Sequence, residues 1–373
     1  MKKTPRIALV HDFIFTYGGA ERVLAIFHEL YPDAPIYTLF AEPEIVAKHY
    51  PKATIVTSFL QKSRLRRWPP LMLGMMPRAV ESFDFTGFDV VLSSSGAFSH
   101  GVITGPETIH LCYCHTPMRY AWDWHNEYLG ERGLTKFPSG ILSRALLSRL
   151  RLWDKVSASR VDRFLCNSGV VASRIKKFYR QDATVVYPPI DTVNLDYAKV
   201  ELKTPERPYA ISASRLTPNK RIDRVIRGCA LAKIPLVIAG GGSQREELEK
   251  VAKEAGGEVT FAGYVSEDEK RSLIANASCF IFSAEDDFGI GPAEALAMGV
   301  PLITLKRGGI QEVVQEGVNG LFFKEATPEA ISEVLAKFLK EGVSGDRKHI
   351  RESVLNLSEE HFRNQIREAV DNA

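Results

Sequence analysis

Residues 283–299 have the sequence SAEDDFGIGPAEALAMG and directly follow the short apolar run Cys279–Phe282. The apolar run is typical of a buried strand. Pro292 suits the first position of a helix, because its missing N–H has no partner there, and Gly299 suits the residue just past the helix end. Three acids and two glycines lie between strand and helix. Backbone N–H groups at a helix start favour an anion, and glycines allow close approach, so the segment predicts a site for a polar, anionic ligand whose hydroxyls the acids hold.

The same segment resembles the E-x7-E signature of the retaining GT-B glycosyltransferases of family 4. In that family the first acid and the Phe-Gly backbone contact the donor sugar, and the second Glu holds the nucleotide ribose. The resemblance places the ribose on Glu294 and the sugar on Asp286, where the family usually has Glu. Glu285, one position earlier, is the alternative contact for the sugar. For this segment alone, an acidic loop before an ordinary helix is the competing interpretation, because short motifs match by chance. The backbone contacts implied for the sugar are Phe288, Gly289 and Ile290.

The length and composition of the chain favour two α/β domains. Its 373 residues exceed one typical domain, and the 45% apolar and 25% charged residues are ordinary for a folded protein. A net charge of +3 does not indicate nucleic-acid binding. The five cysteines lie mostly in apolar segments and are expected to be reduced core residues of a cytosolic protein. No apolar run reaches the roughly 18 residues of a spanning helix, and the N-terminus lacks a signal-peptide pattern.

A glycine pair marks the start of the first domain. Residues 6–10 predict a buried parallel strand, and an amphipathic segment runs from the glycines to Leu30, which is the opening of a doubly wound domain. The pair does not match a dinucleotide fingerprint, yet N–H groups at a helix start suit a diphosphate. A plain turn is the alternative. The sequence GGAER resembles the glycine loop of the family's first domain, which implies that Gly18 and Gly19 face the donor phosphates.

A histidine follows the strand expected over residues 108–114. The motif HTPMRYAWD begins at His115, and a side chain just past a parallel strand lies at the edge where α/β sheets bind ligands. A structural histidine that caps a loop is the alternative. The motif resembles bacterial polysaccharide mannosyltransferases of the family, in which the histidine lies beside the anomeric centre and the acceptor. The resemblance implies a catalytic role for His115 and acceptor-side roles for Arg119 and Tyr120.

Two cations flank the first turn of the second domain. Arg215 and Lys220 lie between an expected strand and helix, where Arg as a fork and Lys as a point charge suit a diphosphate. A pair of surface charges is the alternative. The resemblance implies that both bind the donor diphosphate and stabilise the leaving group, which would make a metal unnecessary. It also implies that Val265, at the end of a later strand, contacts the nucleotide base.

Two basic segments of the first half also carry large apolar residues. Residues 59–78 fit either a membrane-surface patch or a solvated basic face over core residues. Residues 143–156 predict a basic amphipathic helix, a second candidate for a membrane face. The basic side chains concerned are Lys62, Arg64, Arg66, Arg67, Arg78, Arg144, Arg149 and Arg151.

The resemblance implies a GT-B fold, an α/β architecture of two doubly wound Rossmann-like domains facing a cleft. Residues 1–190 would form the acceptor-side domain and residues 191–355 the nucleotide-sugar-binding domain, with the boundary at the proline pair of residues 188–189. Residues 356–373 would form a helix that crosses back to the first domain. Residues 319–323 resemble a late hairpin of the family.

From this resemblance we expect a retaining, metal-independent hexosyltransferase of surface polysaccharide (O-antigen) synthesis. GDP-mannose is the expected donor substrate, a lipid-linked or oligosaccharide chain the expected acceptor, and no cofactor is expected. The expected location is cytoplasmic, peripheral to the anionic inner face of the cell membrane. The alternatives are a transferase of UDP- or dTDP-hexoses, a nucleotide-sugar epimerase, or a phosphorylase, for which no lysine stands in a matching pyridoxal-phosphate motif. A nucleotide-sugar-binding protein of weak activity is a further alternative, which the Asp at position 286 favours.

Overall fold

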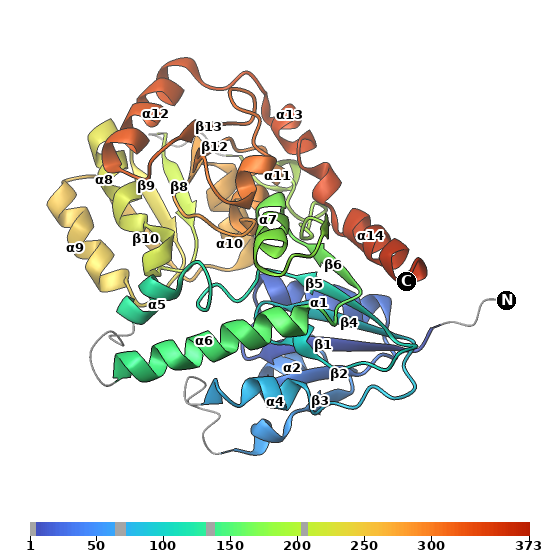
Figure 1. Cartoon of the computed structure of the whole chain (residues 1–373). Helices are drawn as coiled ribbons and strands as arrows, with labels where there is room; N and C mark the ends of the chain where they lie inside the picture. The colour runs from blue at the N-terminus through green and yellow to red at the C-terminus, as the bar shows by residue number, and fades with distance from the viewer. Residues whose placement is uncertain (1–4, 64–71, 132–138, 203–207) are drawn as a thin grey trace. The chain divides into compact units, whose positions relative to one another are not determined.

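A computed structural model describes residues 5–63, 72–131, 139–202 and 208–373 of the chain (Figure 1). The chain divides into two units, one of Met1–Pro188 with Phe362–Ala373 and one of Pro189–His361. Each unit contains a parallel sheet flanked by helices, so the predicted class of two doubly wound α/β domains is confirmed. The two units are described separately below, as unit 1 and unit 2.

The sheet of unit 1 is parallel throughout its described strands. Its strands are β1 (Ile7–Ile14), β2 (Ile36–Ala41), β3 (Ile55–Thr57), β4 (Val90–Ser95), β5 (Ile109–Cys114), β6 (Arg163–Cys166) and β7 (Ala183–Val185). Their order in space is β3-β2-β1-β4-β5-β6-β7. The order reverses between β1 and β4, and ligands of doubly wound sheets bind at the carboxyl ends of strands beside such a reversal.

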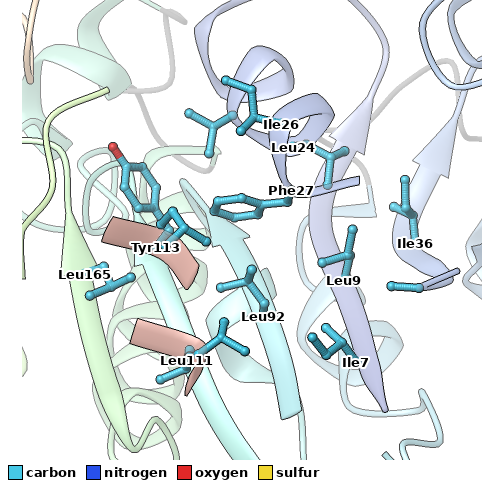
Figure 2. Close-up of a cluster of buried hydrophobic side chains, with 14 of the residues drawn as sticks. Ile7, Leu9, Leu24, Ile26, Phe27, Ile36, Leu92, Leu111, Tyr113 and Leu165 are labelled. Carbon is cyan, nitrogen blue, oxygen red and sulfur yellow. The ribbon is translucent and has the colours of Figure 1, made fainter. Parts of the chain in front are cut away.

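The helices of unit 1 bury apolar side chains against its sheet. They are α1 (Gly19–Leu30), α2 (Pro43–His49), α4 (Met76–Val80), α5 (His125–Glu131), α6 (Ser139–Ala158), α7 (Gly169–Phe178) and α14 (Glu359–Asp371). Figure 2 shows Leu24 and Phe27 of α1 beside Leu92 of β4 and Tyr113 of β5. Phe362 of α14 stacks on Phe27 at 6.1 Å between ring centroids. The last helix of the chain therefore completes the core of unit 1.

The sheet of unit 2 is also parallel. Its strands are β8 (Ala210–Ala213), β9 (Leu236–Ala239), β10 (Val259–Gly263), β11 (Cys279–Phe282), β12 (Leu302–Leu305) and β13 (Gly320–Phe323), in the order β10-β9-β8-β11-β12-β13. The helices are α8 (Ile222–Ala232), α9 (Arg245–Ala255), α10 (Glu267–Ala275), α11 (Ile290–Ala297), α12 (Pro328–Glu341) and α13 (Arg347–Glu352). The order reverses between β8 and β11, which places the carboxyl ends of these strands at the ligand-binding edge.

The structure corrects several local predictions. The expected hairpin at residues 319–323 is wrong, because β13 pairs with β12 in parallel. Helix α11 begins at Ile290, two residues before Pro292. Gly289, at φ 98°, ends the preceding loop, and a proline is tolerated within the first helical turn because N–H groups there have no partner inside the helix. The glycine expected past the helix end, Gly299, has the predicted left-handed φ of 69°.

Two predictions about the whole chain concern its cysteines and membrane spans. All five cysteines are buried and free of disulfides, as predicted for core residues. Throughout the residues that the structure describes, no helix combines the length and apolar character needed to cross a membrane.

Candidate functional site

Five residues at the carboxyl edge of the unit 1 sheet form one connected network of hydrogen bonds and one contact between an imidazole and a carboxylate. Ser94 Oγ at the end of β4 lies 2.8 Å from His115 Nε2 and 3.1 Å from His11 Nδ1. The other ring nitrogen of His11, Nε2, lies 3.7 Å from Glu21 Oε1. Glu21 Oε2 accepts the backbone N–H of Gly18 at 2.9 Å. We call these residues the His115 network; it connects two predicted site residues, Gly18 and His115, through three that the sequence analysis did not single out.

The network has opposite electrostatic character at its two ends. Burial lowers the pKa of the His115 imidazole to about 4, so the ring is neutral at neutral pH. Burial alone would raise the pKa of the Glu21 carboxyl, but the hydrogen bond and charge of His11, with the backbone N–H groups, lower it below its ordinary value. An ionised carboxylate at the helix α1 start therefore connects through His11 and Ser94 to a neutral imidazole.

The glycine pair enters this arrangement differently from the prediction. Gly18 donates its N–H to the Glu21 side chain inside the cap of α1, while Gly19 is the first residue of that helix. A Cβ at Gly18 would lie 3.2 Å from Glu21 Oε2, so the close approach of this carboxylate favours glycine. Of the two predicted phosphate-facing amides, that of Gly18 is thus engaged within the protein.

Asp12, which the sequence analysis did not single out, holds the loop that follows β4. Its Oδ2 accepts the N–H groups of Gly96 at 2.7 Å and Ala97 at 2.8 Å. Its Oδ1 accepts the N–H of Phe98 at 2.8 Å, and both the N–H and the hydroxyl of Ser99 at 2.6 Å. The available signal was an acid at the carboxyl edge of the first strand. The carboxylate fixes the loop beside the strand-order reversal, close in sequence to Ser94.

The predicted acceptor-side residues Arg119 and Tyr120 lie in the loop after His115. Arg119 Nε lies 3.7 Å from Asp123 Oδ2, and Arg174 Nε of α7 lies 3.3 Å from the same oxygen. The guanidinium of Arg119 also lies over the Trp124 ring at 5.8 Å. Tyr120 is partly buried against the core. These contacts anchor the loop that begins at His115.

Unit 2 contains a pocket of about 330 Å³ at the carboxyl ends of β8, β9 and β10. Three predicted donor contacts line it: Arg215, Val265 and Glu294. Tyr264, which the sequence analysis did not name, also lines it, and a Cβ at Gly241 would come within 2.3 Å of the Tyr264 ring. Glycine at position 241 therefore allows this ring to pack directly on the backbone of the pocket wall.

A lysine holds the buried carboxylate of this pocket. Glu294 is only 6% exposed, and its Oε2 lies 3.3 Å from Lys270 Nζ, which also lies 2.8 Å from Glu267 Oε2. Burial alone would lower the pKa of Lys270, but the two carboxylates raise it above its ordinary value, Glu294 contributing most. Lys270 therefore stays charged and forms an ion pair with Glu294. Lys270 was not among the predicted site residues, although its i, i+3 spacing from Glu267 predicts that the two share one face of a helix.

A second ion pair joins two of the predicted donor-binding residues, which lie in neighbouring loops. Lys220 Nζ contacts Asp286 Oδ2 and lies 5.5 Å from the centroid of the Phe282 ring. The backbone carbonyl of Asp286 accepts the N–H of Gly309 at 3.0 Å. Gly308, at φ 79°, leaves no room for a Cβ, which would lie 2.5 Å from that carbonyl. The structure therefore places Asp286 beside Lys220, while Glu285 is exposed.

The predicted site residues thus fall into two clusters, one in each unit. The cluster of unit 1 contains Gly18, Gly19 and His115, with Arg119 and Tyr120 in the adjoining loop. Within the described parts of the chain, no group of three or more His, Cys, Asp or Glu residues is arranged to hold a metal ion. The cluster of unit 2 contains Arg215, Lys220, Val265, Asp286 and Glu294, with Phe288 and Gly289 in the loop that leads into α11 and Ile290 as the first residue of that helix.

Two family models together match nearly the whole chain. The model of glycosyltransferase family 4 matches residues 17–194, and that of glycosyl transferases group 1 matches residues 195–355. An uncharacterized glycosyltransferase of Methanocaldococcus jannaschii is 35% identical over 127 residues, or 32% of each chain. The human alpha-1,3/1,6-mannosyltransferase is 25% identical over 62% of this chain and 59% of its own.

A third relative is the GDP-mannose-dependent alpha-(1-6)-phosphatidylinositol monomannoside mannosyltransferase of Mycobacterium tuberculosis. It is 34% identical over 36% of this chain and 39% of its own length. The alignments with these three relatives span between about a third and three fifths of the relatives' own lengths.

Solved structures match over the full length. Anabaena HepE in complex with UDP has a TM-score of 0.72 at 16% identity, covering 99% of this chain and 100% of that one. Sucrose-phosphate synthase from Thermosynechococcus elongatus has a TM-score of 0.75 at 15% identity, covering 98% of each. At these identities the likeness shows the fold, and the two family models show the sequence relationship. The chain belongs to the family 4 glycosyltransferases, and its two doubly wound units are those of the GT-B fold.

Proposed function

We propose that this protein is a retaining hexosyltransferase that moves mannose from GDP-mannose onto a lipid-linked or oligosaccharide acceptor during surface polysaccharide synthesis. The observation that carries the proposal is the pocket of unit 2, where the buried carboxylate of Glu294 is held by Lys270 on the same wall as Arg215. The names of the human and mycobacterial relatives, both mannosyltransferases and one GDP-mannose-dependent, support the choice of donor.

The chemistry of the pocket suits the parts of a nucleotide sugar. A fixed, ionised carboxylate at Glu294 accepts hydrogen bonds from the two hydroxyls of a ribose. Arg215 is exposed on the pocket rim and offers a forked donor to a diphosphate. Lys220 and Asp286 lie in contact with each other, and in a nucleotide sugar the diphosphate and the sugar are likewise adjacent. The ammonium group of Lys220 therefore suits the phosphate, and the carboxylate of Asp286 suits the sugar hydroxyls.

The proposed reaction needs no covalent nucleophile from the protein. The bond between the anomeric carbon and the phosphate oxygen breaks while the acceptor oxygen bonds to the same face of that carbon. The acceptor proton passes to the departing phosphate oxygen, and the charge that develops on the diphosphate is stabilised by Arg215 and Lys220. His115 is assigned to the reacting face from its resemblance to related transferases. Its neutral imidazole suits a hydrogen bond to a sugar hydroxyl.

A thermal-shift screen with GDP-mannose, UDP-glucose, UDP-galactose and dTDP-glucose tests the donor. GDP-mannose should raise the melting temperature most, because the donor that binds most tightly stabilises the folded state most. A ligand at a hundred times its Kd adds about 2.7 kcal/mol to stability. Glu294→Gln should abolish the shift. Glu254→Gln, which changes an exposed carboxylate of α9 that lies 3.1 Å from Arg227 Nη2, should retain it. Equal shifts in both variants would remove Glu294 from the donor site.

A UDP-hexose is the second candidate donor. Anabaena HepE has been solved with UDP-glucose, and it shares the fold of this chain over its full length. A larger shift with a UDP-sugar than with GDP-mannose would replace the first choice. Release of free sugar from the stabilising donor by the purified protein would separate an enzyme from a nucleotide-sugar-binding protein, for which binding without any turnover is expected.

Helix α6 offers a surface for the proposed attachment to an anionic membrane. Arg144 and Arg149 are exposed along it, and its single acid, Asp154, is buried, so the outward face carries positive charge without compensation from its own helix (Figure 1 shows the helix in green). Basic residues near anionic lipid contribute about 1 kcal/mol each, and apolar side chains add to this by insertion. The exposed apolar side chains of the helix are Ile141, Leu142, Leu152 and Val156.

The structure changes which predicted residues belong to such a surface. Arg151 is partly buried, donates from Nε to the Ala121 carbonyl at 2.7 Å and lies over the Trp122 ring, so it is a packing residue. Met72 and Met76 of the other basic segment are buried in the core. Residues 64–71, which include three of its arginines, lie outside the described residues.

Vesicle co-sedimentation tests this attachment. Vesicles of equal parts phosphatidylcholine and phosphatidylglycerol should bind the protein at low salt, and pure phosphatidylcholine should not. Reversing two charges with Arg144→Glu and Arg149→Glu should weaken binding by at least about tenfold, at roughly 1 kcal/mol per charge. The matched control, Lys250→Glu with Lys253→Glu on α9, should bind as wild type does. Equal loss in both double variants would make the effect one of net charge rather than of this surface.

A further inference from the structure

Strand β4 ends in three consecutive serines, and each hydroxyl meets a different histidine. Because side chains alternate across a strand, Ser94 points to the opposite face from Ser93 and Ser95. Only Ser94 therefore joins the His115 network, whereas its two neighbours serve the other face of the sheet. The pairs are Ser93 with His110 at 2.9 Å, Ser94 with His115 at 2.8 Å, and Ser95 with His100 at 3.2 Å.

The contacts of His11 determine the direction of the hydrogen bonds around Ser94. His11 Nδ1 lies 3.1 Å from the backbone oxygen of Ser94 and 3.1 Å from its hydroxyl oxygen. A carbonyl oxygen only accepts, so Nδ1 of His11 carries a proton and is the donor in these two contacts. The Ser94 hydroxyl then accepts from His11 and has its own proton to donate. Among the residues that the structure describes, the remaining neighbour of this hydroxyl is Nε2 of His115, which therefore accepts.

We propose that Ser94, His11 and Glu21 are positioning residues that fix His115 as the tautomer with its proton on Nδ1. A neutral imidazole carries one proton, so an accepting Nε2 leaves Nδ1–H as the donor of the ring. His115 then offers a hydrogen-bond donor to a sugar oxygen and does not serve as a base. This consequence rests on the proposed function, in which His115 meets the sugar; the tautomer itself does not.

Glu21 extends the same control to the glycine loop. One oxygen of its carboxylate faces His11, and the other accepts the N–H of Gly18 at the start of α1. Rotation of this carboxylate would release both contacts. The side chain of Glu21 thus holds both the conformation of the glycine loop and the orientation of His11. The oriented His11 in turn fixes the hydroxyl of Ser94.

Nitrogen NMR of the protein labelled with ¹⁵N-histidine reads the tautomer directly. The signal of His115, assigned by its loss in His115→Gln, should show a protonated Nδ1 and an unprotonated Nε2 in the wild type. Ser94→Ala should shift it toward the Nε2–H form or a mixture. Ser93→Ala is the matched control, because it removes a hydroxyl from the same strand and should leave the His115 signal unchanged. An Nε2–H tautomer in the wild type, or no change in Ser94→Ala, would overturn the proposal.

Kinetics give a second readout on the same variants. Ser94→Ala should lower kcat by at least about tenfold with little change in KM for the donor, because a group misplaced at the reacting centre affects the transition state most. Ser94→Thr keeps the hydroxyl and should recover most of kcat. Ser93→Ala should lower Tm and leave kcat near wild type. If no nucleotide sugar is turned over, the proposed function fails, while the wild-type spectrum, with the His115 signal assigned through His115→Gln, still decides the tautomer.

Discussion

Replacing Asp12 with Asn should destabilise unit 1 far more than an isosteric change usually does. Asn keeps the shape of Asp, but one of its two terminal groups becomes an NH₂ donor. The side chain of Asp12 is buried, and within the described part of the chain it receives hydrogen bonds only from N–H and O–H donors in the loop at residues 96–99. Any rotamer of Asn therefore turns a donor toward other donors.

The size of the loss follows from the contacts of each oxygen. If the Asn oxygen keeps the place of Oδ1, with its three donors, the new NH₂ group replaces Oδ2 and faces the N–H groups of Gly96 and Ala97. Two hydrogen bonds to a charged acceptor are lost, each worth about 1.5–3 kcal/mol, so the free energy of unfolding should fall by about 3–6 kcal/mol. The opposite rotamer loses three bonds and is worse.

Urea unfolding followed by tryptophan fluorescence measures this loss within unit 1. All four tryptophans of the chain lie between residues 68 and 153, so the signal comes from unit 1 alone. Asp84→Asn is the control, since Asp84 is exposed and its carboxylate accepts the N–H of Thr86 two residues away. It should leave the midpoint unchanged. A free energy of unfolding for Asp12→Asn within about 1 kcal/mol of wild type would refute the assignment of these bonds.

Four further predictions concern the reaction and its pH dependence. Arg215→Ala and Lys220→Ala should each lower kcat/KM by about 30- to 1,000-fold, or about 2–4 kcal/mol, and near-normal turnover in both would remove them from the site. Asp286→Ala should be more damaging than Glu285→Ala; the reverse ranking would assign the sugar contact to Glu285, and equally mild effects would favour a binding protein. Turnover should persist in EDTA, and a complete loss restored by Mn²⁺ or Mg²⁺ would contradict the proposed mechanism. Burial lowers the pKa of His110 to about 3, so below pH 6.5 the unfolded chain binds a proton that the folded chain does not. The contribution of His110 to stability is therefore full above that pH and falls as the pH drops, by up to about 1.4 kcal/mol per pH unit. Urea titrations at several pH values should show a smaller slope for His110→Gln.

The sequence was most informative where a pattern is local. The apolar runs at residues 6–10, 108–114 and 279–282 predicted β1, β5 and β11 at or near their observed positions, because burial on both faces of a parallel sheet requires continuous apolar runs. The spacing of Asp286 and Glu294, with Gly299 past the helix end, likewise depends on one strand, one loop and one helix. In short segments of this kind the local sequence largely fixes the backbone geometry. The family resemblance and the physical pattern therefore led to the same prediction there.

Other features depended on contacts between residues far apart in the chain. The sequence placed His115 just past a strand, but only the strand order brings β1, β4 and β5 side by side, so that His11 and Ser94 reach it. The pairing of Lys270 with Glu294 required the approach of α10 to α11, and the burial of Arg151 required the packing of α6 on the loop after His115. Periodicity states which side of an element is apolar, not which neighbour will cover it.

The amino-acid sequence by itself therefore determined the elements, the family and the strand ends at which ligand groups stand. The tertiary structure alone decided which of those groups form hydrogen bonds and ion pairs with one another. The physical reason is that hydrophobic patterning is a property of each segment, whereas a hydrogen bond needs a donor and an acceptor within about 3 Å of each other. Asp12 illustrates the difference: its sequence position marks only an acid at the carboxyl edge of a strand, and its five donors come from a loop more than eighty residues away.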